Sequence, residues 1–194
     1  MKHIRSSAAA FLAMGLSLPG CMTTPADMAM ADAGGTVTVG GAPMYASRNI
    51  IENAVNSADH TTLVAAVKAA GLVDTLSGAG PFTVFAPTNA AFAKLPAGTV
   101  DTLLQPANLS MLQSVLTYHV VPGRVTAADL MAKIRAGGGT ARLTTVQGGT
   151  LTARMMGDQV MLIDAKGGMS HVTQANVMQS NGVIHVTDAV SIPG

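Results

Sequence analysis

Phe82-Thr83-Val84-Phe85-Ala86-Pro87-Thr88-Asn89-Ala90-Ala91-Phe92 is the most informative stretch of this 194-residue chain. Its first five residues are apolar, aromatic or β-branched, which is the pattern of a buried strand. Pro87-Thr88-Asn89 is typical of a turn, and Phe92 and Leu95 follow it at helical spacing. The stretch therefore predicts a buried strand that turns directly into a helix.

Two later segments accompany this stretch. They are Tyr118-His119-Val120-Val121-Pro122-Gly123 and Asn181-Gly182-Val183-Ile184-His185-Val186-Thr187-Asp188. In their order and spacing, the three segments resemble the fasciclin-like (FAS1) domain: its first signature block, its Tyr-His motif and its closing strand. The resemblance covers residues 46–194 and implies a strand-rich wedge or sandwich flanked by a helical layer. It also implies extracytoplasmic adhesion and binding rather than a shared chemical reaction.

The signals for helix and strand change near residue 140. Before it, apolar residues at helical spacing predict helices at residues 49–55, 63–72, 100–104, 109–116 and 127–134. After it, short runs separated by Gly-containing links predict strands at residues 143–146, 150–155, 159–163, 170–177 and 183–186. A helical half followed by a strand-rich half indicates an α+β fold rather than alternating βαβ units. No internal repeat is visible, so residues 46–194 are expected to form one domain.

The first 20 residues have the features of a signal peptide. Lys2, His3 and Arg5 precede an apolar stretch, Ala8 to Leu18, which is shorter than the roughly 20 residues that a membrane-spanning helix needs. Cys21, the one cysteine of the chain, follows directly and resembles the acylated cysteine of a bacterial lipobox. Acylation would make an outer-membrane lipoprotein that faces the periplasm or the exterior. Cleavage by an ordinary signal peptidase would instead give a secreted protein.

Residues 21–45 are expected to form a flexible tether. Small residues, Gly and Pro dominate this segment, so it has little apolar surface to offset its chain entropy, although Thr36 to Val39 can form a short extended piece. Met22, Met28, Met30 and Met44 suggest a thioether site for Cu(I), but no nearby His or Cys supports one. Methionines tolerated in a tether are the simpler interpretation.

The charge of the chain argues against nucleic-acid binding. Without Lys2 and Arg5, 11 basic residues become nine, which face ten acidic residues and give a net charge of −1. The chain also has no cluster of Lys and Arg to neutralise phosphates. We therefore expect no nucleic-acid partner.

Tyr118 and His119 are the best candidates for a functional pair. By resemblance to family members whose Tyr-His motif is implicated in adhesion, the binding residues would be Leu116, Tyr118, His119, Val120 and Val121. A structural role is the stronger hypothesis. If Tyr118 to Val121 enters a strand, the pair points to opposite faces, and one member is buried and hydrogen-bonded, for example to Thr88 or Asn89.

The remaining histidines are weak candidates for a site. His185 alternates with Ile184 and Val186, as a hydrogen-bonded core or edge histidine would. His171 lies where it can approach Met161 across a hairpin, and with Met169 it suggests a copper site whose geometry nothing specifies. His60 is expected at a helix start, with Ser57 or Asp59 as the cap, and facing solvent.

No enzyme motif is present. The chain has no Gly-x-Ser-x-Gly elbow, His-Glu-x-x-His motif or phosphate loop, and Glu52 is its one glutamate. The sequence predicts a non-catalytic, lipid-anchored binding module, monomeric and without cofactor, that adheres to a cell-surface or matrix protein or polysaccharide. One alternative is a carrier of a small apolar ligand such as a pigment or lipid, with Met155, Met156, Met161 and Met178 lining an apolar patch. A periplasmic Cu(I)-binding protein is the other.

Overall fold

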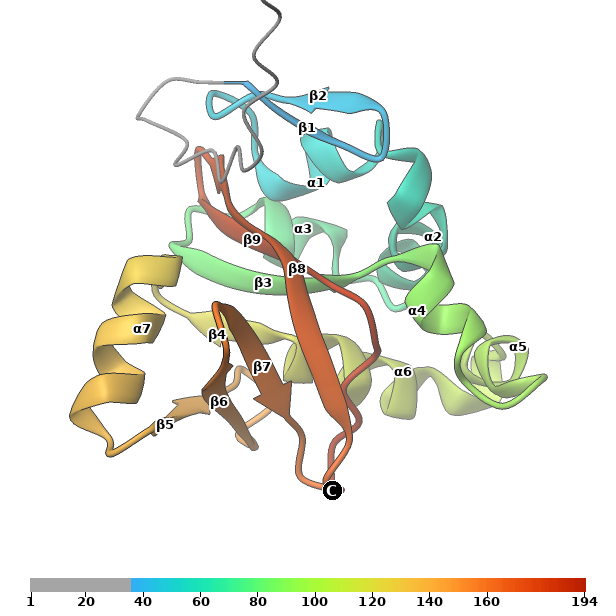
Figure 1. Cartoon of the computed structure of the whole chain (residues 1–194). Coiled ribbons are helices and arrows are strands. Elements are labelled where there is room, and N and C mark those ends of the chain that lie inside the picture. The colour runs from blue at the N-terminus through green and yellow to red at the C-terminus, as the bar shows by residue number, and fades with distance from the viewer. Residues whose placement is uncertain (1–35) are drawn as a thin grey trace, which may run out of the picture.

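The computed structural model describes residues 36–194, so the predicted signal peptide, Cys21 and the first part of the predicted tether lie outside the described residues. A small hairpin, β1 (Val37–Val39) and β2 (Ala42–Met44), begins the described chain (Figure 1). The helical half follows. Its elements are α1 (Ile50–Ala54), η1 (Ala58–His60), α2 (Thr61–Ala69), α3 (Val73–Ser77), α4 (Asn89–Ala93), α5 (Thr99–Leu103), η2 (Pro106–Asn108), α6 (Leu109–Tyr118) and α7 (Ala127–Ala136).

Seven strands form one sheet with the order β4-β3-β9-β8-β7-β6-β5. Their bounds are β3 (Phe82–Pro87), β4 (Val120–Pro122), β5 (Thr140–Thr144), β6 (Thr150–Met156), β7 (Gln159–Ile163), β8 (Met169–Gln179) and β9 (Gly182–Thr187). β3 and β9 pair in parallel, whereas the other neighbours are antiparallel. The α+β class is confirmed, because the hairpin-linked strands follow the helical half. The segments that begin at Phe82 and Asn181 become neighbouring strands of the sheet, β3 and β9.

Strand β3 separates two hydrophobic cores. Val84 and Ala86 point into a core built with helices α1 to α4 and α6, and Phe85 points into a second core beneath α7 and strands β5 to β7. This division follows from the period of two along a strand. In Figure 1, α7 (left) lies beside β4 to β6, away from α1, α2 and α4 (top and right). The predicted buried strand is therefore confirmed, and both of its faces are covered.

The long strand β8 bends to serve both halves of the sheet. It pairs with β7 through Met169 to His171 and with β9 through Val172 to Gln179, and its register shifts twice on the way to Val177. Asn176, at φ 59°, lies within the second irregularity. Such bulges increase the bend and twist of a strand. The outer strands of the sheet, β4 and β5, also approach each other, because Val146 N, just after β5, donates a 2.8 Å hydrogen bond to Val120 O in β4.

Local capping explains where several helices start. Asn49 and Glu52 form a reciprocal capping box at α1, as Thr126 and Asp129 do at α7. Thr88 accepts a hydrogen bond from Ala91 N at the start of α4, directly after the turn that the sequence predicts. These helices are confirmed at nearly the predicted positions.

The prediction of a flexible tether up to residue 45 is wrong for residues 37–44. Val39 and Met44 are 4% and 3% exposed and pack into the first core. Gly40 and Gly41, both at positive φ, form the turn of the hairpin. Composition suggested a tether because the local segment is poor in large apolar residues. The hairpin is instead stabilised by apolar surface that distant segments supply.

The strand predicted from Tyr118 is also partly wrong. Tyr118 is the last residue of α6, His119 is its helical C-cap, and the strand begins only at Val120. Leu112, Val115 and Leu116 are buried at helical spacing and extend the helix to this point. The cap predicted for α2 is wrong as well, since His60 precedes the helix and no side chain caps it.

Candidate functional site

Tyr118 joins three segments of the second core. Its side chain is fully buried, and its hydroxyl donates to Thr150 O at 2.7 Å and accepts from Ala165 N at 3.0 Å. Burial raises the pKa of this hydroxyl, so the group stays protonated. The end of α6 is thereby attached to the start of β6 and to the loop after β7.

His119 fastens the C-terminal segment to the end of α6. Its Nδ1 lies 2.8 Å from Val115 O, and its Nε2 lies 2.9 Å from Ser191 N. Because a backbone N–H only donates, Nε2 accepts from Ser191, and the proton resides on Nδ1, which donates to Val115. Burial lowers the pKa of the ring, against the opposing effects of the Val115 carbonyl and Asp164. His119 is therefore neutral and has both nitrogens occupied.

The five residues predicted to bind a partner lie on two sides of the sheet. Leu116, His119 and Val120 face the first core, and Tyr118 and Val121 face the second. All five are at most 5% exposed. None presents a surface to a partner in the folded domain. Their role in adhesion stays a prediction, and the hydrogen bonds to Thr88 or Asn89 that the sequence suggested are replaced by those above.

His185 also has a structural role, as predicted. It is fully buried, and its ring stacks on Phe85 with 5.5 Å between centroids. Its Nε2 lies 2.8 Å from Val125 O, which a protonated Nε2 satisfies as donor. Asn181, at the start of the same block, accepts from Ile50 N and donates to the carbonyls of Leu76 and Gly78. The third block therefore links the sheet to α1 and α3.

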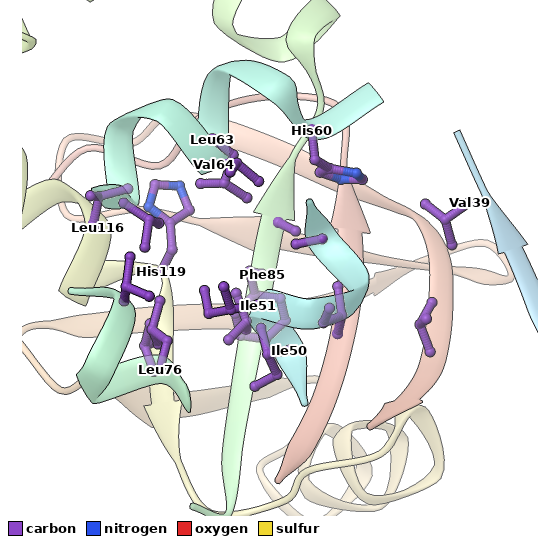
Figure 2. Close-up of a pocket in the computed structure, with 18 of the residues that line it drawn as sticks. Val39, Ile50, Ile51, His60, Leu63, Val64, Leu76, Phe85, Leu116 and His119 are labelled. Atoms are coloured by element: carbon purple, nitrogen blue, oxygen red, sulfur yellow. The ribbon is translucent and has the colours of Figure 1, made fainter. Parts of the chain in front are cut away.

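A cavity of about 40 Å³ lies in the first core, between α1, α2 and strand β3 (Figure 2). Its walls are almost wholly apolar. Helix α2 contributes Leu63, Val64 and Val67, and the N-terminal hairpin contributes Val39 and Met44. Leu116, His119 and Val120 line it from the α6–β4 junction, so the structure brings three of the predicted binding residues to one cavity.

His60 lies at the wall of this cavity and is 3% exposed, so the prediction that it faces solvent is wrong. Its Nδ1 lies 2.9 Å from Ser57 Oγ, which is itself 3.3 Å from Val39 O. Its Nε2 has no hydrogen-bond partner among residues 36–194. Burial lowers the pKa of the ring, and the Ala86 carbonyl and Asp59 act in the opposite direction. The apolar spacing of residues 63, 64 and 67 was the available signal that residue 60 shares their buried face.

Ser57 and His60 do not constitute a catalytic triad. A triad requires a carboxylate that orients the base through its second ring nitrogen. In the described chain, no carboxylate is bonded to His60, whose second nitrogen faces the cavity wall. Both side chains are buried, at 1% and 3% exposure, so neither is presented at the protein surface.

The residues proposed for copper are only partly brought together. Met161 and His171 are register partners, as the sequence suggested, but Met161 is buried and Met169 is 61% exposed. His171 Nδ1 lies 3.4 Å from Asp188 Oδ2, which also pairs with Lys94 at 3.2 Å. Within residues 36–194, no group of three or more His, Cys, Asp or Glu side chains is placed to hold a metal ion.

The methionines suggested for an apolar ligand patch do not meet. Met155, Met156 and Met161 lie on the β6–β7 hairpin, whereas Met178 lies near the other end of β8 beside β9. Met44 is the methionine that lines the cavity. None of the helices described is both long enough and apolar enough to cross a bilayer.

Comparison with known proteins identifies the family. The family model of the fasciclin domain matches residues 58–193. The chain is 48% identical over 144 residues to Protein sll1483 of Synechocystis, covering 74% of this chain and 73% of that protein. It is 37% identical over 180 residues to immunogenic protein MPB70 of Mycobacterium bovis, covering 90% and 81%. The chain belongs to the fasciclin family.

Two further matches cover half of the other protein or less. The chain is 40% identical over 122 residues to cell surface glycolipoprotein MPB83 of Mycobacterium bovis, covering 63% of this chain and 48% of that protein. Its fold matches a FAS1 domain pair from the insect cell adhesion molecule Fasciclin I with a TM-score of 0.65 and 18% identity. That match covers 74% of this chain and 50% of the insect chain, and it shows the fold alone.

Proposed function

We propose that the protein is a non-catalytic binding domain of the cell envelope that mediates attachment to a cell-surface or matrix component. The observation that carries this proposal is membership of the fasciclin family together with a lipobox-like leader that ends at Cys21. The relatives support it, since one is named a cell surface glycolipoprotein and another an immunogenic protein. The domain would act as a monomer through surface complementarity, with acyl chains on Cys21 as its anchor.

The described surface supplies candidate contacts. Six large apolar side chains are exposed by at least 40%: Tyr45, Val55, Met111, Val146, Met156 and Met169. They lie just after the N-terminal hairpin, in the helical half and in the strand-rich half, and none belongs to the three segments quoted from the sequence, 82–92, 118–123 and 181–188. A partner protein or polysaccharide would therefore be recognised by surface residues that surround the buried motifs.

Attachment and anchorage are tested with one set of strains. A deletion strain is compared with strains that express the native chain or the Cys21→Ser variant, in surface attachment, aggregation and biofilm assays. The native chain should restore attachment. Cys21→Ser should release the protein from the membrane fraction and lose the mass of the acyl chains. Unchanged attachment in the deletion strain under every condition would reject the adhesive role, whereas a Cys21 without acyl chains would reject the anchor alone.

A further inference from the structure

The cavity in the first core follows one face of α2. Its lining includes His60, Leu63, Val64, Val67 and Lys68, which are spaced as one helical stripe. Eight residues at 1.5 Å each place the ends of this stripe about 12 Å apart along the helix. His60 is buried at one end, and Lys68 is exposed at the other. The cavity therefore extends from the exposed end of this stripe, at Lys68, to a buried imidazole.

The buried end has a single polar atom without a partner. His119 also lines the cavity, but both of its nitrogens are hydrogen-bonded. His60 Nε2 makes no hydrogen bond within residues 36–194, although the Ala86 carbonyl is near enough to the ring to raise its pKa. A buried polar group left unsatisfied costs about 1–3 kcal/mol, so such a group needs a reason. A ligand atom that reaches Nε2 would remove this cost.

Ser57 allows His60 to act as a donor or as an acceptor. If Ser57 Oγ–H donates to His60 Nδ1, the ring proton is on Nε2 and a ligand must accept it. If Ser57 Oγ–H donates to Val39 O, Nδ1–H donates to Ser57, and Nε2 becomes an acceptor. A hydroxyl group both donates and accepts, so it matches either arrangement.

We propose that this cavity is a binding site for a small neutral aliphatic alcohol, whose hydroxyl bonds to His60 Nε2 and whose carbon chain lies along Leu63, Val64 and Val67. A charged head group does not suit the buried end, because no opposite charge lies among the lining residues there. The volume of about 40 Å³ is about three to four times the roughly 10–15 Å³ that one water requires, so the cavity has room for about three or four heavy atoms. The ligand is therefore short-chained. This site is independent of the proposed adhesive role.

The test compares 1-propanol with 1-chloropropane, which has nearly the same shape and cannot donate a hydrogen bond. Each compound is titrated into the purified chain, and the methyl signals of Leu63, Val64 and Val67 and the ring nitrogens of His60 are followed by NMR. We expect saturable shifts at these methyls and about fivefold tighter binding of 1-propanol, the effect of one net hydrogen bond. The Nε2 signal should shift with 1-propanol and stay in place with 1-chloropropane.

Two variants and a control separate the hydroxyl contact from the cavity itself. His60→Leu should bind both compounds with equal affinity, and Val64→Trp, which fills the cavity, should bind neither. His171→Leu, at a partly exposed histidine away from the cavity, should keep the fivefold preference. The proposal is overturned if 1-propanol shows no saturable binding, as a cavity that holds water alone would, or if its preference survives in His60→Leu. The Nε2 signal of the native chain decides the matter if the variants do not fold.

Discussion

Replacing Tyr118 by Phe tests whether the Tyr-His motif is structural. The change removes one oxygen and leaves two backbone groups, Thr150 C=O and Ala165 N–H, without their partner. Each unsatisfied buried group costs about 1–3 kcal/mol. Because water can reach part of this site, we expect a loss of about 2–4 kcal/mol in the free energy of unfolding. That is a large part of the roughly 5–15 kcal/mol that stabilises a domain.

The assay is urea unfolding followed by far-UV circular dichroism, since the chain has no Trp to serve as a fluorophore. Tyr45→Phe is the matched control, because the chain has two tyrosines and Tyr45 is 40% exposed. Its effect should stay within about 0.5 kcal/mol. If both variants lose equally little stability, the bonds of Tyr118 do not hold the fold together. If Tyr118→Phe keeps full stability but loses attachment in cells, the motif contacts a partner directly.

Three further predictions concern stability. Burial lowers the pKa of His60, His119 and His185, so the unfolded chain takes up protons at a higher pH than the folded chain does. The free energy of unfolding should be largest above about pH 6.5 and fall below it by up to about 1.4 kcal/mol per pH unit for each histidine. A urea midpoint that stays constant between pH 7.5 and 5 would contradict this. A chain that starts at Ala46 lacks the buried Val39 and Met44 and should unfold about 3–6 kcal/mol more easily than one that starts at Gly35; equal urea midpoints would mean that the hairpin is dispensable. Gly182→Ala places a Cβ against Phe82 O in the β3–β9 ladder and should cost more than about 3 kcal/mol in urea unfolding. Gly71→Ala, with open space and φ +67°, should cost about 1 kcal/mol in the same assay.

Local patterns predict the fold well where neighbours in sequence determine the structure. The strand from Phe82, the cap at Thr88 and the glycine-linked strands after residue 140 all depend on residues within a few positions. The parallel pairing of β3 with β9 joins residues about 100 positions apart, and no local pattern in the sequence predicts it. The burial of the β1–β2 hairpin has the same origin, because the surface that covers Val39 comes from the rest of the core.

The candidate sites also depend on contacts between distant segments, which local patterns do not predict. Tyr118-His119-Val120-Val121 contains the aromatic and β-branched residues of a strand, yet the buried stripe of α6 continues to Tyr118. His185 was predictable, because the strict alternation around it leaves little choice of face. His60 had one local signal, its helical spacing from Leu63, Val64 and Val67, but its burial also depends on how a 3₁₀ turn, a hairpin and α2 meet. Sequence alone gives no signal for an unpartnered nitrogen in a cavity.

The placement of the motif constrains how loss of adhesion can be interpreted in this family. At the C-terminal end of α6, Tyr118 packs into the second core, and Leu116 and His119 face the first. His119 also accepts a hydrogen bond from Ser191 N of the C-terminal segment. A substitution here acts on both cores and on the chain terminus at once. Loss of attachment after such a substitution therefore reports a damaged scaffold as readily as a lost contact. A variant can locate the proposed attachment surface only if its free energy of unfolding equals that of the native chain. Substitutions of the exposed residues Met111, Met156 and Met169 permit that comparison because they leave both cores intact.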